Sequence, residues 1–165
     1  MDHRLSLPSP CLPAEICDYI LDYLWDDHKT LQVCSLVTRE WLPETRRHLF
    51  HFVRIISNER RVAFEDVISH SGGAVALGVR VLDLWERNTI PVSLPQMLAS
   101  LGRLEKLTLR VYVLDDCSSS AETIAWPVLP MVKTLHVKIS VVNDIASLQR
   151  FICACPSLSS LNIQI

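Results

Sequence analysis

The stretch Leu104-Glu105-Lys106-Leu107-Thr108-Leu109 decides the fold, because its spacing of apolar residues returns along the chain. The spacing is apolar-x-x-apolar-x-apolar, and its second half alternates apolar and variable residues as a strand with one buried face does. Other copies run over residues 79–84, 132–137 and 158–163, and a degenerate copy covers residues 50–55. Each copy therefore predicts a short strand.

The copies recur at a nearly constant interval. Their spacings are 29, 25, 28 and 26 residues between the central positions Val53, Leu82, Leu107, Leu135 and Leu161. Self-similarity at roughly 20 to 29 residues is typical of leucine-rich repeats, in which each connector returns the chain to place the next strand in parallel. We therefore predict an α/β fold for residues 51–165, with a short, irregular leucine-rich-repeat solenoid around a parallel sheet.

Two features make these repeats irregular. The family pattern places Asn or Cys three residues after the last strand leucine, where this chain has Arg87, Tyr112 and Ser140. The last predicted strand also reaches Ile165, so we expect an incomplete repeat domain, from a truncated chain, with an open sheet edge.

Alternate residues of each strand should point to opposite faces of the sheet. The leucines at 82, 84, 107, 109, 135 and 161 are expected in the core. On the other face, an exposed Trp is often an interface anchor. The candidate residues for binding a target there are Trp85, Arg110, His136 and Lys138. A solvated face explains the same pattern equally well.

The first third of the chain predicts helices instead. Pro13 suits the start of a first helix, since its missing N–H has no intrahelical partner at that position. A second helix is expected to extend to Trp41, and Pro43 to open a third that ends at Phe50. Three short helices cannot bury all of their own apolar side chains, so part of this surface should face the repeats or a partner.

In order and spacing, residues 12–50 resemble the F-box. The matching residues are Leu12-Pro13-x-Glu15-Ile16, Ile20, Leu24, Leu31, Cys34-Ser35-Leu36-Val37, Trp41, Arg46 and Leu49-Phe50. The resemblance covers about the first third of the chain, and coupling to downstream leucine-rich repeats is frequent in the family. It implies a three-helix unit at 12–50, after a flexible N-terminus at 1–11 and before the repeat domain at 51–165.

The resemblance also implies a function. F-box helices bind the Skp adaptor and, through it, a cullin, while the repeats hold a target protein, here unknown, for ubiquitin transfer by proximity. The residues expected to form or support the Skp-binding surface are Leu12, Pro13, Ile16, Ile20, Leu31, Cys34, Val37 and Trp41. The chain would then be a non-enzymatic ubiquitin-ligase adaptor in the cytoplasm or nucleus of a eukaryotic cell. The alternatives are a leucine-rich-repeat interaction module without a ligase role, or an inactive fragment of one.

Other classes of function find no support in the sequence. It lacks nucleophile, zinc-protease and phosphate-loop motifs, so we expect no catalytic residues and no cofactor. His48-x-x-His51 would need two further zinc ligands, and none stands at ligand spacing, so no metal is expected. A net charge of −2 disfavours nucleic acid, and no apolar run is long enough to predict a membrane span.

Overall fold

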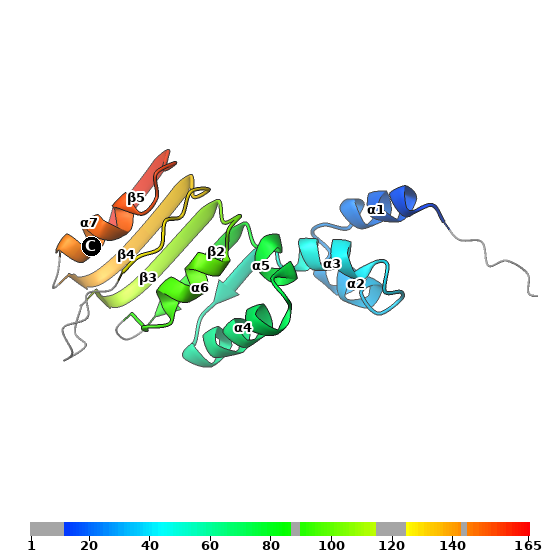
Figure 1. The fold of residues 1–165 in the computed structure, drawn as a ribbon, viewed down its shortest axis with the longest axis horizontal. Helices are drawn as coiled ribbons and strands as arrows, with labels where there is room; N and C mark the ends of the chain where they lie inside the picture. The colour runs from blue at the N-terminus through cyan, green and yellow to red at the C-terminus, as the bar shows by residue number, and fades with distance from the viewer. Residues whose placement is uncertain (1–11, 87–89, 115–124, 143–144) are drawn as a thin grey trace, which may run out of the picture. The chain divides into compact units, whose positions relative to one another are not determined.

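The computed structural model describes residues 12–86, 90–114, 125–142 and 145–165, so the predicted flexible N-terminus at 1–11 lies outside it. The described part is mixed α/β, with seven helices and a five-stranded parallel sheet (Figure 1). The chain divides into two compact units, Met1–Leu49 and Phe50–Ile165. Our sequence-based boundary falls one residue later, after Phe50.

The first unit is built from three short helices. They are α1 (Ala14–Tyr23), α2 (His28–Cys34) and α3 (Leu42–Leu49). Their small core has Leu21 and Leu31 fully buried at its centre, beside Cys34. Partly buried side chains around it are Leu24, Trp41 and Leu49. The helices therefore have a core of their own.

Local hydrogen bonds set the ends of α2. The polar turn before it supplies the N-cap, because the Asp27 carboxylate accepts from the backbone N–H of Thr30 at 3.1 Å and from its hydroxyl at 2.7 Å. The hydroxyl bond is also the main reason that the pKa of Asp27 is lowered. The expected extension to Trp41 is wrong, because after Cys34 the backbone bonds tighten to i→i−3, as from Leu36 N–H to Val33 C=O.

The second unit contains the parallel sheet. Its strands are β1 (Phe52–Ile55), β2 (Val81–Glu86), β3 (Lys106–Leu114), β4 (Thr134–Val142) and β5 (Ser160–Gln164), paired in sequence order. The five central residues predicted from the repeat lie opposite one another in register, in the order Val53, Leu82, Leu107, Leu135 and Leu161. The predicted strands and their parallel pairing are confirmed.

A backbone hydrogen-bond pattern repeats at the start of each strand. The carbonyl of His51 accepts from the N–H groups of Arg80 and Val81. The carbonyls of Arg80, Glu105 and Lys133 each accept in the same way from two consecutive N–H groups of the following strand region. The backbone therefore repeats at the interval that the apolar residues follow in the sequence.

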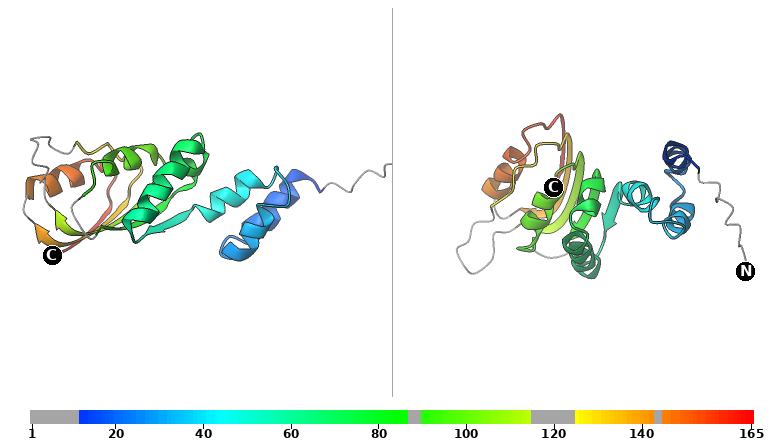
Figure 2. Two further views of the ribbon diagram at one scale, coloured as in Figure 1. Left: turned by 90° about the horizontal axis from the view of Figure 1, so that it is seen from below. Right: turned by 45° about the vertical axis from the view of Figure 1, so that its right-hand side comes forward.

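Helices lie in the connections β1–β2, β2–β3 and β4–β5, and they cover one face of the sheet (Figure 2). They are α4 (Asn58–His70), α5 (Ala74–Gly78), α6 (Leu94–Ser100) and α7 (Ile145–Cys153). The main core lies between this helical layer and the sheet, where Phe64, Leu98 and Phe151 from the helices join the strand leucines. Gly73 precedes α5 with φ +86°, in the left-handed region that glycine adopts without strain.

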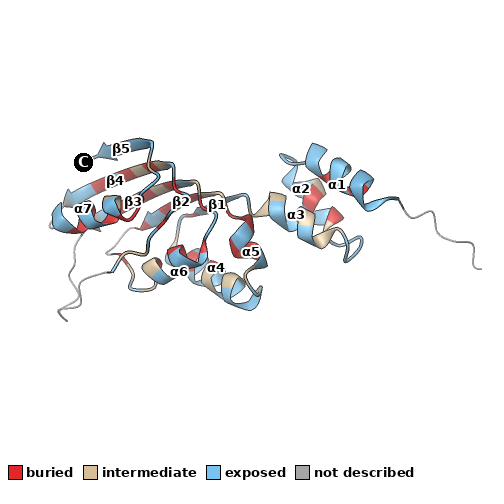
Figure 3. Cartoon of the chain, turned by 45° about the horizontal axis from the view of Figure 1, so that its top comes forward, coloured by how far each residue is buried: buried red, intermediate tan, exposed pale blue. Residues whose placement is uncertain are grey.

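Two residues differ from their expected burial. Leu161 is 44% exposed, although we expected it in the core, because every described residue of β5 is exposed at the edge of the sheet (Figure 3). Asp83 lies on the expected outward face but is only 5% exposed. The reason is that Arg54 and Arg110 approach its carboxylate from the two neighbouring strands.

Candidate functional site

An exposed apolar stripe runs along α1 and the residue pair before it. Ile16 and Ile20 are one helical turn apart and are 48% and 40% exposed, and Leu12 precedes them by the same interval. The adjoining positions Cys17 and Leu21 are buried instead. The helix thus turns one apolar side inward and leaves a second in solvent, which is the arrangement of a helix that binds a partner.

The residues predicted for Skp binding do not all reach the surface. Leu31 is fully buried and Cys34 nearly so, and both belong to the core of the three helices. They can support a docking surface but cannot form one in this conformation. Pro13 and Val37 are exposed, and Trp41 is half-buried.

A hollow of about 400 Å³ adjoins the stripe. Leu12, Pro13, Cys17 and Trp41 supply much of its apolar wall, while the acids Asp18 and Glu40 also line it. The predicted residues from the start of α1 and from the turn before α3 therefore meet at one place. The hollow can take an apolar side chain from a partner, with a basic group beside it.

Three exposed aromatic residues near this stripe were not predicted from the sequence. Tyr19, Tyr23 and Trp25 are all more than half exposed; Tyr19 lies between Ile16 and Ile20 in the sequence, and Tyr23 and Trp25 follow Ile20. The two tyrosines follow Ile16 and Ile20 at a spacing of three residues, so the helical period was a sufficient signal for them. Exposed aromatic residues are frequent anchors at interfaces, so we add these to the candidate surface.

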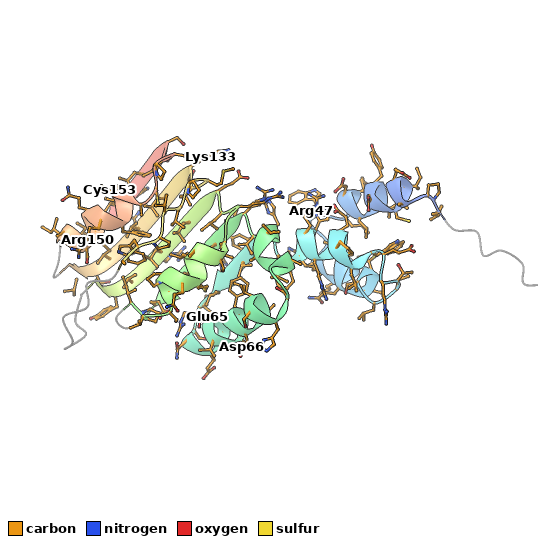
Figure 4. The ribbon with its side chains drawn as sticks, viewed as in Figure 1. Arg47, Glu65, Asp66, Lys133, Arg150 and Cys153 are labelled. Carbon is orange, nitrogen blue, oxygen red and sulfur yellow. The ribbon has the colours of Figure 1, made fainter. Side chains whose placement is uncertain are left out.

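A cluster of four polar side chains joins α1 to α3. Arg47, which Figure 4 labels, donates to Asp22 at 2.5 Å and to Glu44. His48 lies 2.9 Å from Asp22 and 3.3 Å from Glu44. The pKa of Arg47 is raised, first by its bond to Glu44. The spacing within α3 predicts the Glu44 pairs, whereas no sequence signal brings in Asp22 from 25 residues away.

This cluster gives His48 the acidic neighbours that a metal site would need. Asp22, Glu44 and His48 could offer three ligand atoms within 4.8 Å of one another. Arg47, however, already brings a positive charge to both carboxylates. The cluster is therefore best explained as an ion network that holds two helices together.

The opposite face of the sheet from the helices brings the four candidate target-binding residues together. We call this the open face; it consists of the outward residues of β1 to β5. Register places Trp85 opposite Arg110 and Arg110 opposite Lys138, and His136 lies two residues before Lys138 on β4. Residues from three strands, 25 and 28 positions apart in the sequence, thus form one row.

Arg110 is held in place by its neighbours in this row. Its guanidinium carbon lies 4.5 Å from the centroid of the Trp85 ring, in a cation–π contact. Its Nη2 lies 3.6 Å from Asp83 Oδ2, which is the distance of an ion pair. The same oxygen accepts a hydrogen bond from Arg54 Nε at 3.1 Å. A charged group fixed from two sides loses less side-chain entropy when a ligand binds it.

Two hollows lie on the open face, and both are lined by Arg110 and Lys138. The first is about 450 Å³ and is mainly apolar; its other outward residues are Trp85, Tyr112 and Ser140. The second is about 310 Å³ and polar, with His136, Asn162 and Gln164. Tyr112 and Ser140 stand where the repeat pattern has Asn or Cys. In this chain β3 continues through Tyr112 and β4 through Ser140, and both side chains line the first hollow.

A buried ion pair lies on the core side of β2. Arg61 of α4 and Glu86 are both more than nine-tenths buried, with Arg61 Nε 3.3 Å from Glu86 Oε1 but not aligned for a hydrogen bond. Arg61 also donates to Glu65 at 2.5 Å and to Ser93 at 2.6 Å. Ser93, the residue before α6, donates its hydroxyl to Glu65 at 2.9 Å and does not cap the helix with its side chain. This network ties α4 to the residue before α6.

We expect Glu86→Gln to remove a pH dependence of stability. Burial raises the pKa of Glu86 above its ordinary 4.5, against the attraction of Arg61, so the folded chain holds this proton more tightly than the unfolded chain. The stability that this tighter proton binding contributes is therefore present below the ordinary pKa. It is lost as the pH rises through the pKa of the folded chain. Urea titrations from about pH 4 to about pH 7 should show wild type losing stability relative to the variant. If wild type instead gained stability with rising pH, the attraction of Arg61 would outweigh the effect of burial on the pKa of Glu86.

The described cysteines carry no reactive arrangement that we recognise. Cys17, Cys34 and Cys155 are buried, and Cys153 is exposed near the end of α7 (Figure 4). All four are free, and burial raises the pKa of the Cys155 thiol, which lowers its reactivity. The side chains of Cys153 and Cys155 thus point to different surroundings, the first to solvent and the second to the core.

Within the described residues, no helix has the length and apolar character needed to cross a bilayer. Comparison of the chain with protein-family models, with curated proteins and with solved structures found no match in any of the three. The two candidate surfaces are therefore interpreted from their own geometry and chemistry.

Proposed function

We propose that the chain is a substrate adaptor of a cullin-based ubiquitin ligase. In this proposal the helices of residues 12–49 form an F-box that binds the Skp adaptor, and the sheet unit is an irregular leucine-rich-repeat domain that holds a target protein. The chain performs no chemistry itself. It raises the local concentration of the target near a ubiquitin-charged enzyme bound elsewhere on the cullin.

The exposure of Leu12, Ile16 and Ile20 carries this proposal. An isolated three-helix unit has no need to expose these side chains in a stripe, and the small core of Leu21, Leu31 and Cys34 is complete without them. They coincide with positions that the F-box resemblance assigns to Skp binding. A few aliphatic anchors beside an apolar hollow are sufficient for specific binding when a partner buries them.

Binding of the intact chain to purified Skp adaptor tests the proposal. We expect a one-to-one complex by size-exclusion chromatography with light scattering, and a dissociation constant of about one micromolar or below by calorimetry. An unrelated soluble protein of similar size and charge serves as the control for non-specific adhesion of the apolar stripe. If the chain and the Skp adaptor elute separately at concentrations well above that constant, the ligase role is wrong.

The register of the five strands favours a second candidate, a repeat-based interaction module without a ligase role. The open face presents a continuous row of polar and aromatic side chains whether or not residues 12–49 bind a partner. The two candidates make different predictions for the same preparation. An interaction module binds its ligand through the sheet and fails to bind the Skp adaptor, whereas a ligase adaptor binds both.

A further inference from the structure

Arg110 and Lys138 are adjacent on neighbouring strands and form the boundary between two hollows of different character. On one side the Trp85 and Tyr112 rings make the hollow apolar, and on the other His136 and Asn162 make it polar. A ligand that occupies both hollows must pass over the two cations. The boundary is therefore the point that selects the charge of the ligand.

The open face is cationic among its described residues. The strand register places four basic side chains on it, Arg54, Lys106, Arg110 and Lys138. The single acid that the register places on this face is Asp83, which is buried and close to Arg54 and Arg110. Glu86 also lines the apolar hollow, but its buried carboxylate lies 3.3 Å from Arg61. Among the described residues, no ion pair involves Lys106 or Lys138. The face thus has unbalanced positive charge beside an apolar hollow.

From this charge and shape we propose that the open face binds an extended acidic segment of a partner protein. A carboxylate of the segment lies between the Arg110 guanidinium and the Lys138 ammonium. An apolar side chain two residues away enters the hollow of Trp85 and Tyr112. This identifies the class of target in the proposed function and rests on its target-binding half, but it does not depend on binding of the Skp adaptor.

The spacing of the strand supports this arrangement. Alternate residues of an extended chain are about 7 Å apart on one side, and Arg110 and Tyr112 are alternate residues of β3. A peptide that runs along the strand therefore has side chains at the same interval as the cation and the apolar hollow. An acidic residue and an apolar residue separated by one position satisfy both at once.

The same features favour a protein segment over a nucleic acid. A nucleic acid needs a track of cations that follows the phosphates, whereas Asp83 partly neutralises Arg54 and Arg110. The net charge of −2 also gives no general attraction for a polyanion. A carboxylate with an adjacent apolar group needs only one charged contact and the hollow.

Fluorescence anisotropy with labelled peptides tests the proposal on the intact chain. The probe is a short peptide with the repeat Glu-Ser-Leu, and its matched control has Gln for every Glu. We expect the Glu peptide to bind at least about tenfold more tightly, with an affinity that falls as salt rises. Lys138→Gln should weaken binding by about tenfold, whereas Arg60→Gln, the same charge change at an exposed position of α4, should leave it unchanged.

Arg110→Gln should also weaken binding, but it removes a neighbour of Asp83 as well, so a second readout that does not depend on this variant is needed. Binding should change the tryptophan emission of wild type and not that of Trp85→Phe, while the circular dichroism of each variant stays that of wild type. Equal binding of the Glu and Gln peptides, or no effect of Lys138→Gln, overturns the proposal. So does tighter binding of a phosphoserine peptide of matched sequence or of an oligothymidine. Failure to bind the Skp adaptor leaves these results unaffected.

Discussion

Ile20→Asp is expected to weaken binding of the Skp adaptor by at least about a hundredfold while leaving the folded chain intact. Ile20 is 40% exposed in the second turn of α1 and is outside the core of Leu21, Leu31 and Cys34, so a carboxylate there remains in water in the free chain. In the complex the same carboxylate would be buried against an apolar partner without a counter-charge, at a cost of several kcal/mol. Calorimetry and thermal unfolding measure the two quantities separately.

Val62→Asp is the matched control for this substitution. Val62 is 44% exposed and also lies within a helix, α4, but in the sheet unit. The substitution should therefore leave Skp binding unchanged, and it should change the free energy of unfolding as little as Ile20→Asp does. Skp binding by Ile20→Asp at the affinity of wild type would remove the exposed stripe from the interface, and with it the main support for the ligase role.

The sheet could be predicted from the sequence because its signals are local and repeated. Each strand has its own alternation of apolar residues, and the central residues from Val53 to Leu161 recur at an interval that one helical connector can span. Given parallel pairing, the register follows from that interval. The row of Trp85, Arg110 and Lys138 was predictable for the same reason, since each of these residues stands three positions after an aligned central leucine.

Features that depend on long-range contacts could not be predicted. The carboxylate of Asp22 meets Arg47 and His48 only after α1 packs on α3, and nothing in its local sequence indicates a partner. Asp83 follows the pattern of an outward residue, yet two arginines from other strands bury it. The division of α1 into an inward side and an outward side was also open, because Ile16, Cys17, Ile20 and Leu21 are equally apolar. Packing decides which of them faces water.

Leu135→Ala is expected to lower the free energy of unfolding of the sheet unit by about 3 to 5 kcal/mol. Leu135 is fully buried in the fourth strand, between Leu107 and Leu161 in register and within the core that includes Phe151 and Leu148. Truncation removes apolar contacts and leaves a cavity that neighbours on both adjacent strands cannot fill. Urea unfolding followed by circular dichroism measures the change in midpoint at constant slope.

Leu161→Ala is the matched substitution one strand along, and it should cost only about 1 kcal/mol. The two leucines share a position in the repeat and differ in burial, since Leu161 is 44% exposed on β5, where truncation leaves an open notch rather than a cavity. The difference between them therefore measures what the covering layer contributes to a strand leucine. Equal losses at the two positions would mean that Leu161 is covered in solution, and that the edge of this sheet is a contact surface rather than a solvated one.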